Sequence, residues 1–209
     1  ALAAIYREIK VSAEPLESDL LESSGDWAQR ANDDADPRRI NWHGFRIYEA
    51  VASRQRVLDL AVPMGFDGFY IAQKINLRWR SPWLAELRRT NRDAFLEECA
   101  EQIAAGYIFW RDRLGVTSPY AMPFNEPIGG YDELAGATPE DLVEILVRAG
   151  RRLRAAGFDR IRFVAPNGDT PVRTLALAKA ILKDPEARAY VGAIGYHSYP
   201  VGGAYADIP

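Results

Sequence analysis

The sequence predicts an α/β fold, namely a partial (β/α)8 TIM-type barrel with about five β/α units, as one domain over residues 1–209. Short strand-like segments, either apolar or with alternating apolar and polar residues, alternate along the chain with amphipathic helical segments. This order is typical of parallel β-α units. Polar and aromatic residues gather where the strands pass into helices, the face that carries the active site in such barrels. A doubly wound open sheet gives the same alternation, but no glycine-rich phosphate loop follows the first strand.

The first third of the chain supplies two strand candidates and one helix. Residues 6–13 alternate and form the first strand candidate, which ends at Glu14 and Pro15. An N-cap residue at Asn41 predicts a helix to about Gly65 that Pro63 ends early. Residues 66–76 form the second strand candidate, followed by an aromatic-rich loop over residues 78–83.

The middle of the chain has the clearest helical period. Apolar residues spaced alternately four and three positions apart predict one buried stripe on a helix over residues 92–114. We expect the aromatic members to be core residues rather than a ligand platform. The stripe consists of Leu96, Ala100, Ile103, Tyr107, Trp110 and Leu114. A short strand bounded by prolines follows, over residues 118–124.

Two further helices and two strands complete the expected order. Thr138 with an acid at position 141 forms a capping box for a helix that Gly157 ends. Residues 160–166 are the fourth strand, Pro171 opens a helix to about residue 182, and residues 191–197 are the fifth strand. A complete barrel has eight strands in about 250 residues, so the chain is expected to be a fragment.

Composition excludes several classes of partner and chemistry. The net charge of −3 argues against nucleic acid and anionic membranes, and no apolar run is long enough to span a bilayer. Cys99 is the only cysteine, so no disulfide forms within the chain. The two histidines show no metal-ligand spacing, and we expect neither a metal nor a cofactor. The compartment and oligomeric state stay open, and a soluble, secreted protein is compatible with the sequence.

The beginning of the chain is not that of a signal peptide, since its apolar stretch is short and has no basic lead. It also lacks an initiating methionine. We therefore expect these residues to begin inside a longer sequence.

The triplet Asn125-Glu126-Pro127 is the strongest candidate for chemistry. It stands at the exit of the strand over residues 118–124, where a carboxyl group is well placed to donate a proton. Because proline disfavours the helical region for the preceding residue, we expect an extended backbone at Glu126. A retaining glycosidase needs such an acid/base and a second carboxylate about 5–5.5 Å away.

These residues make the chain resemble a clan A glycoside hydrolase, from about the second barrel strand through the sixth. The resemblance implies that Glu126 is the general acid/base. It implies that His197 lines the sugar site, and that Tyr199 contacts the nucleophile, which Arg7 braces. Residues 32–37 and 81–83 resemble the family of glucosylceramidases and endo-xylanases, family thirty. The nucleophile of the clan is a glutamate on the seventh strand, so we expect it beyond residue 209 and expect the chain alone to be inactive.

Other polar and aromatic residues near strand exits are candidates for binding the carbohydrate substrate. Tryptophan rings stack on sugar faces, while amides and carboxylates bind hydroxyl groups. Asn125 is expected to contact the sugar 2-hydroxyl. The remaining candidates are Trp79, Trp83, Glu14, Asn76 and Asn167, with Lys74 and Asp169 as weaker ones. If the strands are parallel, Glu14, Asn76, Glu126, Asn167 and His197 should converge on one face.

Two alternatives to a β-glycan or β-glycoside hydrolase stay open. A carbohydrate-binding pseudoenzyme would keep the aromatic cleft without turnover. An unrelated barrel lyase or aldolase would use a catalytic lysine, for which Lys74 is the one candidate, although its neighbours Gln73 and Asn76 are polar.

Overall fold

The computed structural model describes the second half of the chain almost continuously and the first half in short pieces. The described residues are 21–23, 36, 38–42, 45–47, 59–60, 62–65, 70–72, 82–115, 117–128 and 136–197. The first strand candidate, residues 6–13, lies outside them.

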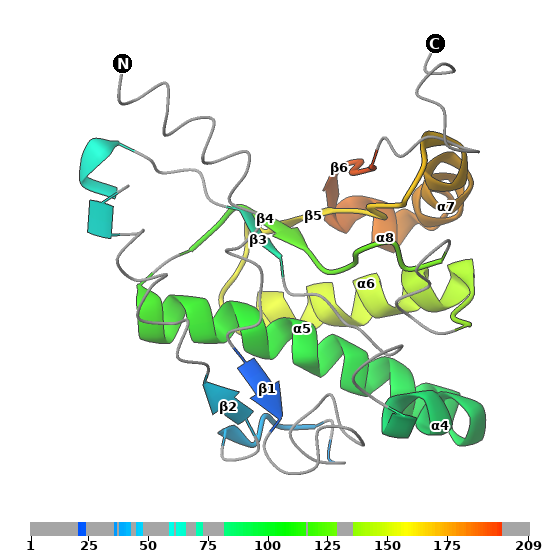
Figure 1. Ribbon diagram of the computed structural model, residues 1–209, viewed down its shortest axis with the longest axis horizontal. Coiled ribbons are helices and arrows are strands. Elements are labelled where there is room, and N and C mark those ends of the chain that lie inside the picture. Colours follow the sequence, from blue (N-terminus) through cyan, green and yellow to red (C-terminus); the bar gives the residue numbers. More distant parts are fainter. Residues whose placement is uncertain are drawn as a thin grey trace.

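A small parallel sheet is the centre of the described part (Figure 1). Its strands are β3 (Tyr70–Ala72), β4 (Tyr120–Met122), β5 (Arg162–Val164) and β6 (Val191–Ala193), paired in parallel in chain order. Each strand falls within a segment for which the sequence predicts a strand. The parallel pairing follows from the helices between the strands, which return the chain to the same edge of the sheet.

The expected partial (β/α)8 barrel is wrong for the described part of the chain. The structure is mostly helical, its strands have three residues each, and the sheet is open with β3 and β6 at its edges. Tyr120 on β4 is 44% exposed, whereas the strands of a closed parallel barrel are covered on both faces. Alternation of strands and helices predicts parallel neighbours, but closure depends on strand number, tilt and stagger, which the alternation does not encode.

Residues 41–65 do not form the single helix that the sequence predicts. Phe45–Ile47 form strand β2, which pairs antiparallel with β1 (Leu21–Ser23), so the helix expected from Asn41 is wrong. Within that range, residues 59–60 are helical and Val62–Met64 form the short 3-10 helix η3, which contains Pro63. Pairing with a distant segment has overridden the local capping signal. Figure 1 shows β1 and β2 on the side of α5 away from the parallel sheet.

Three long helices match the sequence closely. They are α5 (Arg92–Leu114), α6 (Pro139–Ala155) and α7 (Pro171–Lys183). The capping box at Thr138 is present, and Gly157 takes the left-handed φ of 89° that favours glycine just after α6. Two shorter helices, α4 (Pro82–Thr90) and α8 (Pro185–Tyr190), were not expected, and α4 begins inside the segment expected to be a loop.

The core lies between the sheet and helices α5 and α6. Tyr107 and Trp110 on α5 are fully buried, as the stripe predicts, and the Tyr107 hydroxyl accepts a hydrogen bond of 3.0 Å from the Met122 backbone N–H. Helix α6 packs against α5, α7 and α8, so it is the central helix of the layer. None of the described helices is long and apolar enough to cross a bilayer.

A buried carboxylate joins three of these helices. Asp141, at the start of α6, accepts hydrogen bonds from the Thr138 backbone N–H, from Arg88 of α4 at 2.7 Å and from Arg92 of α5 at 2.6 Å. Burial alone would raise the pKa of Asp141. The Thr138 hydrogen bond and the two guanidinium groups outweigh burial and hold that pKa below its ordinary value of 3.8.

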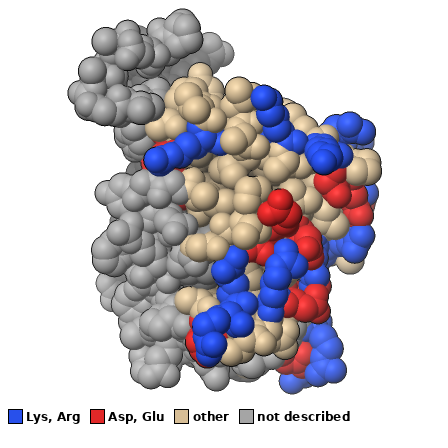
Figure 2. Space-filling view, turned by 90° about the vertical axis from the view of Figure 1, so that its right-hand side faces the viewer, with Lys and Arg blue, Asp and Glu red and all other residues tan. Residues whose placement is uncertain are grey.

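The same helices carry a row of ion pairs at the surface. Arg148 of α6 contacts Asp93 and Glu97 of α5 at 2.7 Å each, and Arg152 contacts Glu97 at 2.9 Å. Figure 2 shows basic and acidic side chains interleaved on the face that α4, α6 and α7 present at the right of Figure 1. A face that mixes both signs in this way is typical of a solvated surface rather than a binding site for nucleic acid.

We predict that Asp141→Asn lowers the free energy of unfolding by about 2–4 kcal/mol at neutral pH, since it leaves two guanidinium groups without their shared carboxylate and weakens the α6 cap. Urea unfolding followed by circular dichroism measures the change. The matched control is Glu86→Gln, which removes the exposed partner of Arg89 on α4 and should alter stability little.

The effect of Asp141→Asn should depend on pH in one direction. Because folding lowers the pKa of Asp141, the charged carboxylate stabilises the fold fully above about pH 4, the unfolded value. The contribution disappears as the pH falls through the lower folded pKa. The gap between wild type and variant should therefore be constant from pH 7 to 5 and close only under strong acid. A gap that closes already near pH 6 would contradict this account.

Candidate functional site

The candidate site is built around a contact between Glu126 and His197. Glu126 follows β4 by four residues, and His197 follows β6 by four residues. The Nδ1 atom of His197 lies 2.6 Å from Oε1 of Glu126. The Glu126 side chain is 4% exposed and that of His197 is 20% exposed, so the pair stands at the edge between core and solvent. A carboxyl group with one oxygen held by a hydrogen bond keeps the other for a substrate.

The exit of β5 lies between these two residues and binds the backbone of both. The carbonyl of Asn167 accepts the N–H of Glu126 at 2.9 Å. The next carbonyl, that of Gly168, accepts the N–H of His197 at 2.7 Å, beside a parallel bridge between Gly168 and Tyr196. Parallel strands bring their carboxyl ends to one edge, and the three exits therefore meet.

The side chains of Asn125 and Asn167 also meet at these strand ends. Asn167 is 4% exposed, and its Nδ2 donates to the carbonyl of Phe124 at 3.2 Å. The same Nδ2 lies 3.5 Å from Oδ1 of Asn125, which is half-buried. The amides of β4 and β5 thus lie against each other at the strand ends.

The backbone at Glu126 differs from the extended conformation expected before Pro127. Its φ of 46° lies in the left-handed region, which is uncommon for a residue with a side chain. The bond from its N–H to Asn167 and the contact with His197 hold it there. Such conformations persist where the surrounding contacts determine them, and they are concentrated at functional sites.

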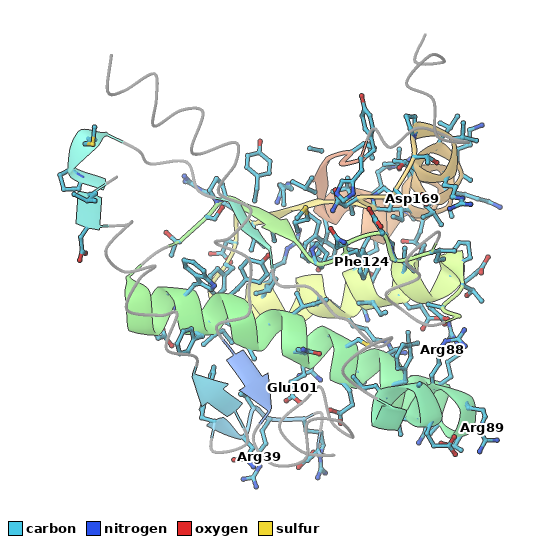
Figure 3. The ribbon with its side chains drawn as sticks, viewed as in Figure 1. Arg39, Arg88, Arg89, Glu101, Phe124 and Asp169 are labelled. Atoms are coloured by element: carbon cyan, nitrogen blue, oxygen red, sulfur yellow. The ribbon has the colours of Figure 1, made fainter. Side chains whose placement is uncertain are left out.

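A second carboxylate stands near the same strand ends. Asp169 is 6% exposed and pairs with Arg173 of α7 at 2.5 Å. The α7 helix itself is capped by Thr170, whose hydroxyl accepts the N–H of Arg173. Figure 3 shows Asp169 beside α7 and Phe124 on the side of the sheet that faces α6. The ion pair with Arg173 occupies one oxygen of the Asp169 carboxylate, which suits a structural or substrate-binding role.

Several predicted site residues lie outside the described part, and their roles stay predictions. Trp83 falls within α4 instead of a loop, and its side chain is not described. Of the five residues expected to converge, Glu126, Asn167 and His197 do lie together. The undescribed candidates are Arg7, Glu14, Lys74, Asn76, Trp79 and Tyr199.

Two glycines that shape the site were missed from the sequence. A Cβ on Gly168 would lie 2.5 Å from Thr174 Oγ1, and a Cβ on Gly195 would lie 2.9 Å from the Val164 side chain and 3.1 Å from Asn167 Oδ1. Only glycine lets these backbone segments approach so closely. For Gly168 the signal was the Asn-Gly-Asp sequence at the exit of β5, which is typical of a turn.

Metal and thiol chemistry find no support in the residues that the structure describes. No group of three or more His, Cys, Asp or Glu side chains among them could hold a metal ion. Cys99 is fully buried in α5, and burial raises the pKa of its thiol well above the ordinary value, so it stays protonated and inert.

Comparison with known proteins gives no match to a protein-family model, a curated protein or a solved structure.

We predict that Glu126 and His197 stabilise the fold jointly. A double-mutant cycle of Glu126→Ala and His197→Ala, followed by urea unfolding, should give a coupling free energy of about 1–2 kcal/mol. The control cycle combines His197→Ala with Asp159→Ala. Asp159 is exposed before β5, at the opposite end of the strand, and should be additive within about 0.5 kcal/mol. Additivity in the first cycle as well would mean that the 2.6 Å contact does not hold in solution.

Proposed function

We propose that this chain carries the acid/base half of a retaining glycoside hydrolase site that acts on a β-linked glycan or glycoside, with Glu126 as the general acid/base. One observation carries the proposal. The carboxyl group of the Asn125-Glu126-Pro127 triplet is buried at a strand exit, with one oxygen 2.6 Å from His197 Nδ1. A proton donor for a leaving group needs this combination of a fixed direction and limited access to water.

The reaction has two steps in this proposal. Protonated Glu126 first gives its proton to the glycosidic oxygen while the nucleophilic carboxylate attacks the anomeric carbon. The C–O bond breaks, the aglycone leaves as an alcohol, and a glycosyl ester forms on the nucleophile. Ionised Glu126 then takes a proton from water, whose oxygen attacks the anomeric carbon and releases the sugar and the nucleophile.

His197 orients the acid/base. In the tautomer with its proton on Nδ1, His197 donates to Oε1 of Glu126 in both steps, and Oε2 is left to exchange the proton. We also assign to Asn125, directly before Glu126, a contact with a sugar hydroxyl. We assign sugar contacts to Trp79, Trp83, Glu14, Asn76 and Tyr199 as well, and the bracing of the nucleophile to Arg7 and Tyr199.

The nucleophile is assigned to a glutamate outside the described residues. Asp169 is less suited to the role because its carboxylate already pairs with Arg173. The family resemblance to clan A glycoside hydrolases stays a proposal on the same footing, resting on the triplet and on His197.

Kinetics of Glu126→Gln in the full-length natural protein test the proposal. We predict a fall of about 10²–10⁴-fold in kcat for β-glycosides with alkyl leaving groups, because they require protonation to leave. The rate of the glycosylation step with 2,4-dinitrophenyl β-glycosides should fall far less, because the 2,4-dinitrophenolate group leaves without protonation. For Glu126→Ala, added azide should restore turnover and yield a β-glycosyl azide, since azide attacks the glycosyl ester without needing a base.

The control variant is Asp159→Asn, at the opposite end of β5, which should hydrolyse like the wild type. A panel of β-glucosides, β-xylosides, β-galactosides and β-mannosides covers the substrate class. Binding of a glycan without hydrolysis by the wild type would identify a pseudoenzyme instead. Hydrolysis that survives Glu126→Gln unchanged on every substrate would overturn the assignment of the acid.

A further inference from the structure

Asn167 and Glu126 share an unusual backbone conformation. Their φ values are 56° and 46°, and in the described part they are the two residues other than glycine with a positive φ. Asparagine tolerates this region better than most residues, whereas glutamate is rarely found there. The two residues are also joined, because the Glu126 N–H donates to the Asn167 carbonyl at 2.9 Å. A residue that accepts the conformation readily thus supports one that does not.

The Asn167 side chain contacts the two residues that precede Glu126. Its Nδ2 donates to the Phe124 carbonyl at 3.2 Å and lies 3.5 Å from Oδ1 of Asn125. Three successive residues at the exit of β4 are therefore each contacted by Asn167. With 4% of its surface exposed, this residue offers little of itself to a ligand.

The residue that follows Asn167 binds the backbone of His197. The next carbonyl along the chain, that of Gly168, accepts the His197 N–H at 2.7 Å. A Cβ on Gly195 would lie 3.1 Å from Asn167 Oδ1, so the β6 exit also packs tightly against this side chain. Consecutive peptide groups at the β5 exit therefore set the separation between Glu126 and His197.

We propose that Asn167 is a positioning residue that aims the Glu126 carboxyl group at His197, rather than a residue that binds sugar. The inference rests on the proposed function insofar as the aimed carboxyl group is the acid/base. Misplacement of a reacting group by about 1 Å lowers rates by about 10²-fold, so a residue that never touches substrate can still control turnover.

Two variants remove the amide donor in different ways. Asn167→Gly keeps the left-handed backbone and its carbonyl, and Asn167→Asp keeps the shape of the side chain but cannot donate to Phe124. Both should lower kcat for alkyl β-glycosides about 10–100-fold with KM changed less than about 3-fold. The fall in kcat should be smaller for 2,4-dinitrophenyl β-glycosides, because their leaving group departs without a proton from the acid. Asn91→Gly, at the N-cap of α5, is the matched control and should leave the kinetics unchanged.

A sugar-binding asparagine gives a different result, namely a raised KM with kcat preserved, and this would overturn the proposal. So would a lowered Tm in both variants with kcat and KM unchanged, since Asn167 would then be structural alone.

Proton NMR provides a readout that does not depend on glycosidase activity. In wild type, the His197 Nδ1 proton, held by Glu126, should give a downfield signal protected from exchange with water. The signal should be lost in Asn167→Gly and Asn167→Asp while the fold is retained, and should persist in Asn91→Gly. The wild type could show the signal and yet hydrolyse no glycoside of the panel. Loss of the signal in the two Asn167 variants would then support positioning and refute the proposed function. A signal and kinetics that both survive in the Asn167 variants would refute positioning and leave the proposed function intact.

Discussion

The ionic contact of Asp141 with Arg88 and Arg92 is the interaction on which the helical layer depends. One carboxylate closes the first turn of α6 and binds the helices before it in the chain, α4 and α5. A buried charge is tolerated only when it is paired and hydrogen-bonded, and here three donors meet that requirement. Because α6 also packs against α7 and α8, the Asp141 contacts join α4 and α5 to the helix at the centre of the layer.

The candidate site arises from the parallel arrangement above this layer. Three strands that run in one direction deliver their exits to one edge, and residues from positions 126, 167 and 197 come into contact there. The polar groups at this edge bind one another through backbone carbonyls rather than through side chains alone. Their geometry is therefore held by the sheet, which is the rigid support that the proposed proton donor requires.

The left-handed backbone at Glu126 is the feature of the site that is hardest to explain by stability alone. A conformation with a positive φ is unfavourable by about 1–3 kcal/mol for such a residue and needs compensation from its neighbours. The Asn167 carbonyl and His197 supply that compensation. Strain that is held by its surroundings at a buried carboxyl group agrees with a role in chemistry, which the proposed acid/base assignment provides.

The sequence by itself determined the local elements whose signals lie within a few residues. The stripe from Leu96 to Trp110, the capping box at Thr138 and the proline that opens α7 place three helices to within a residue or two, because capping and periodicity act over one or two turns. It also indicated that the residues after β4, β5 and β6 belong together. The tertiary structure alone decided that Phe45–Ile47 pairs with β1 instead of forming a helix, that the described sheet is open, and that Glu126 is left-handed despite Pro127. Each of these depends on a partner far away in the chain, and local propensity is weaker than such long-range contacts.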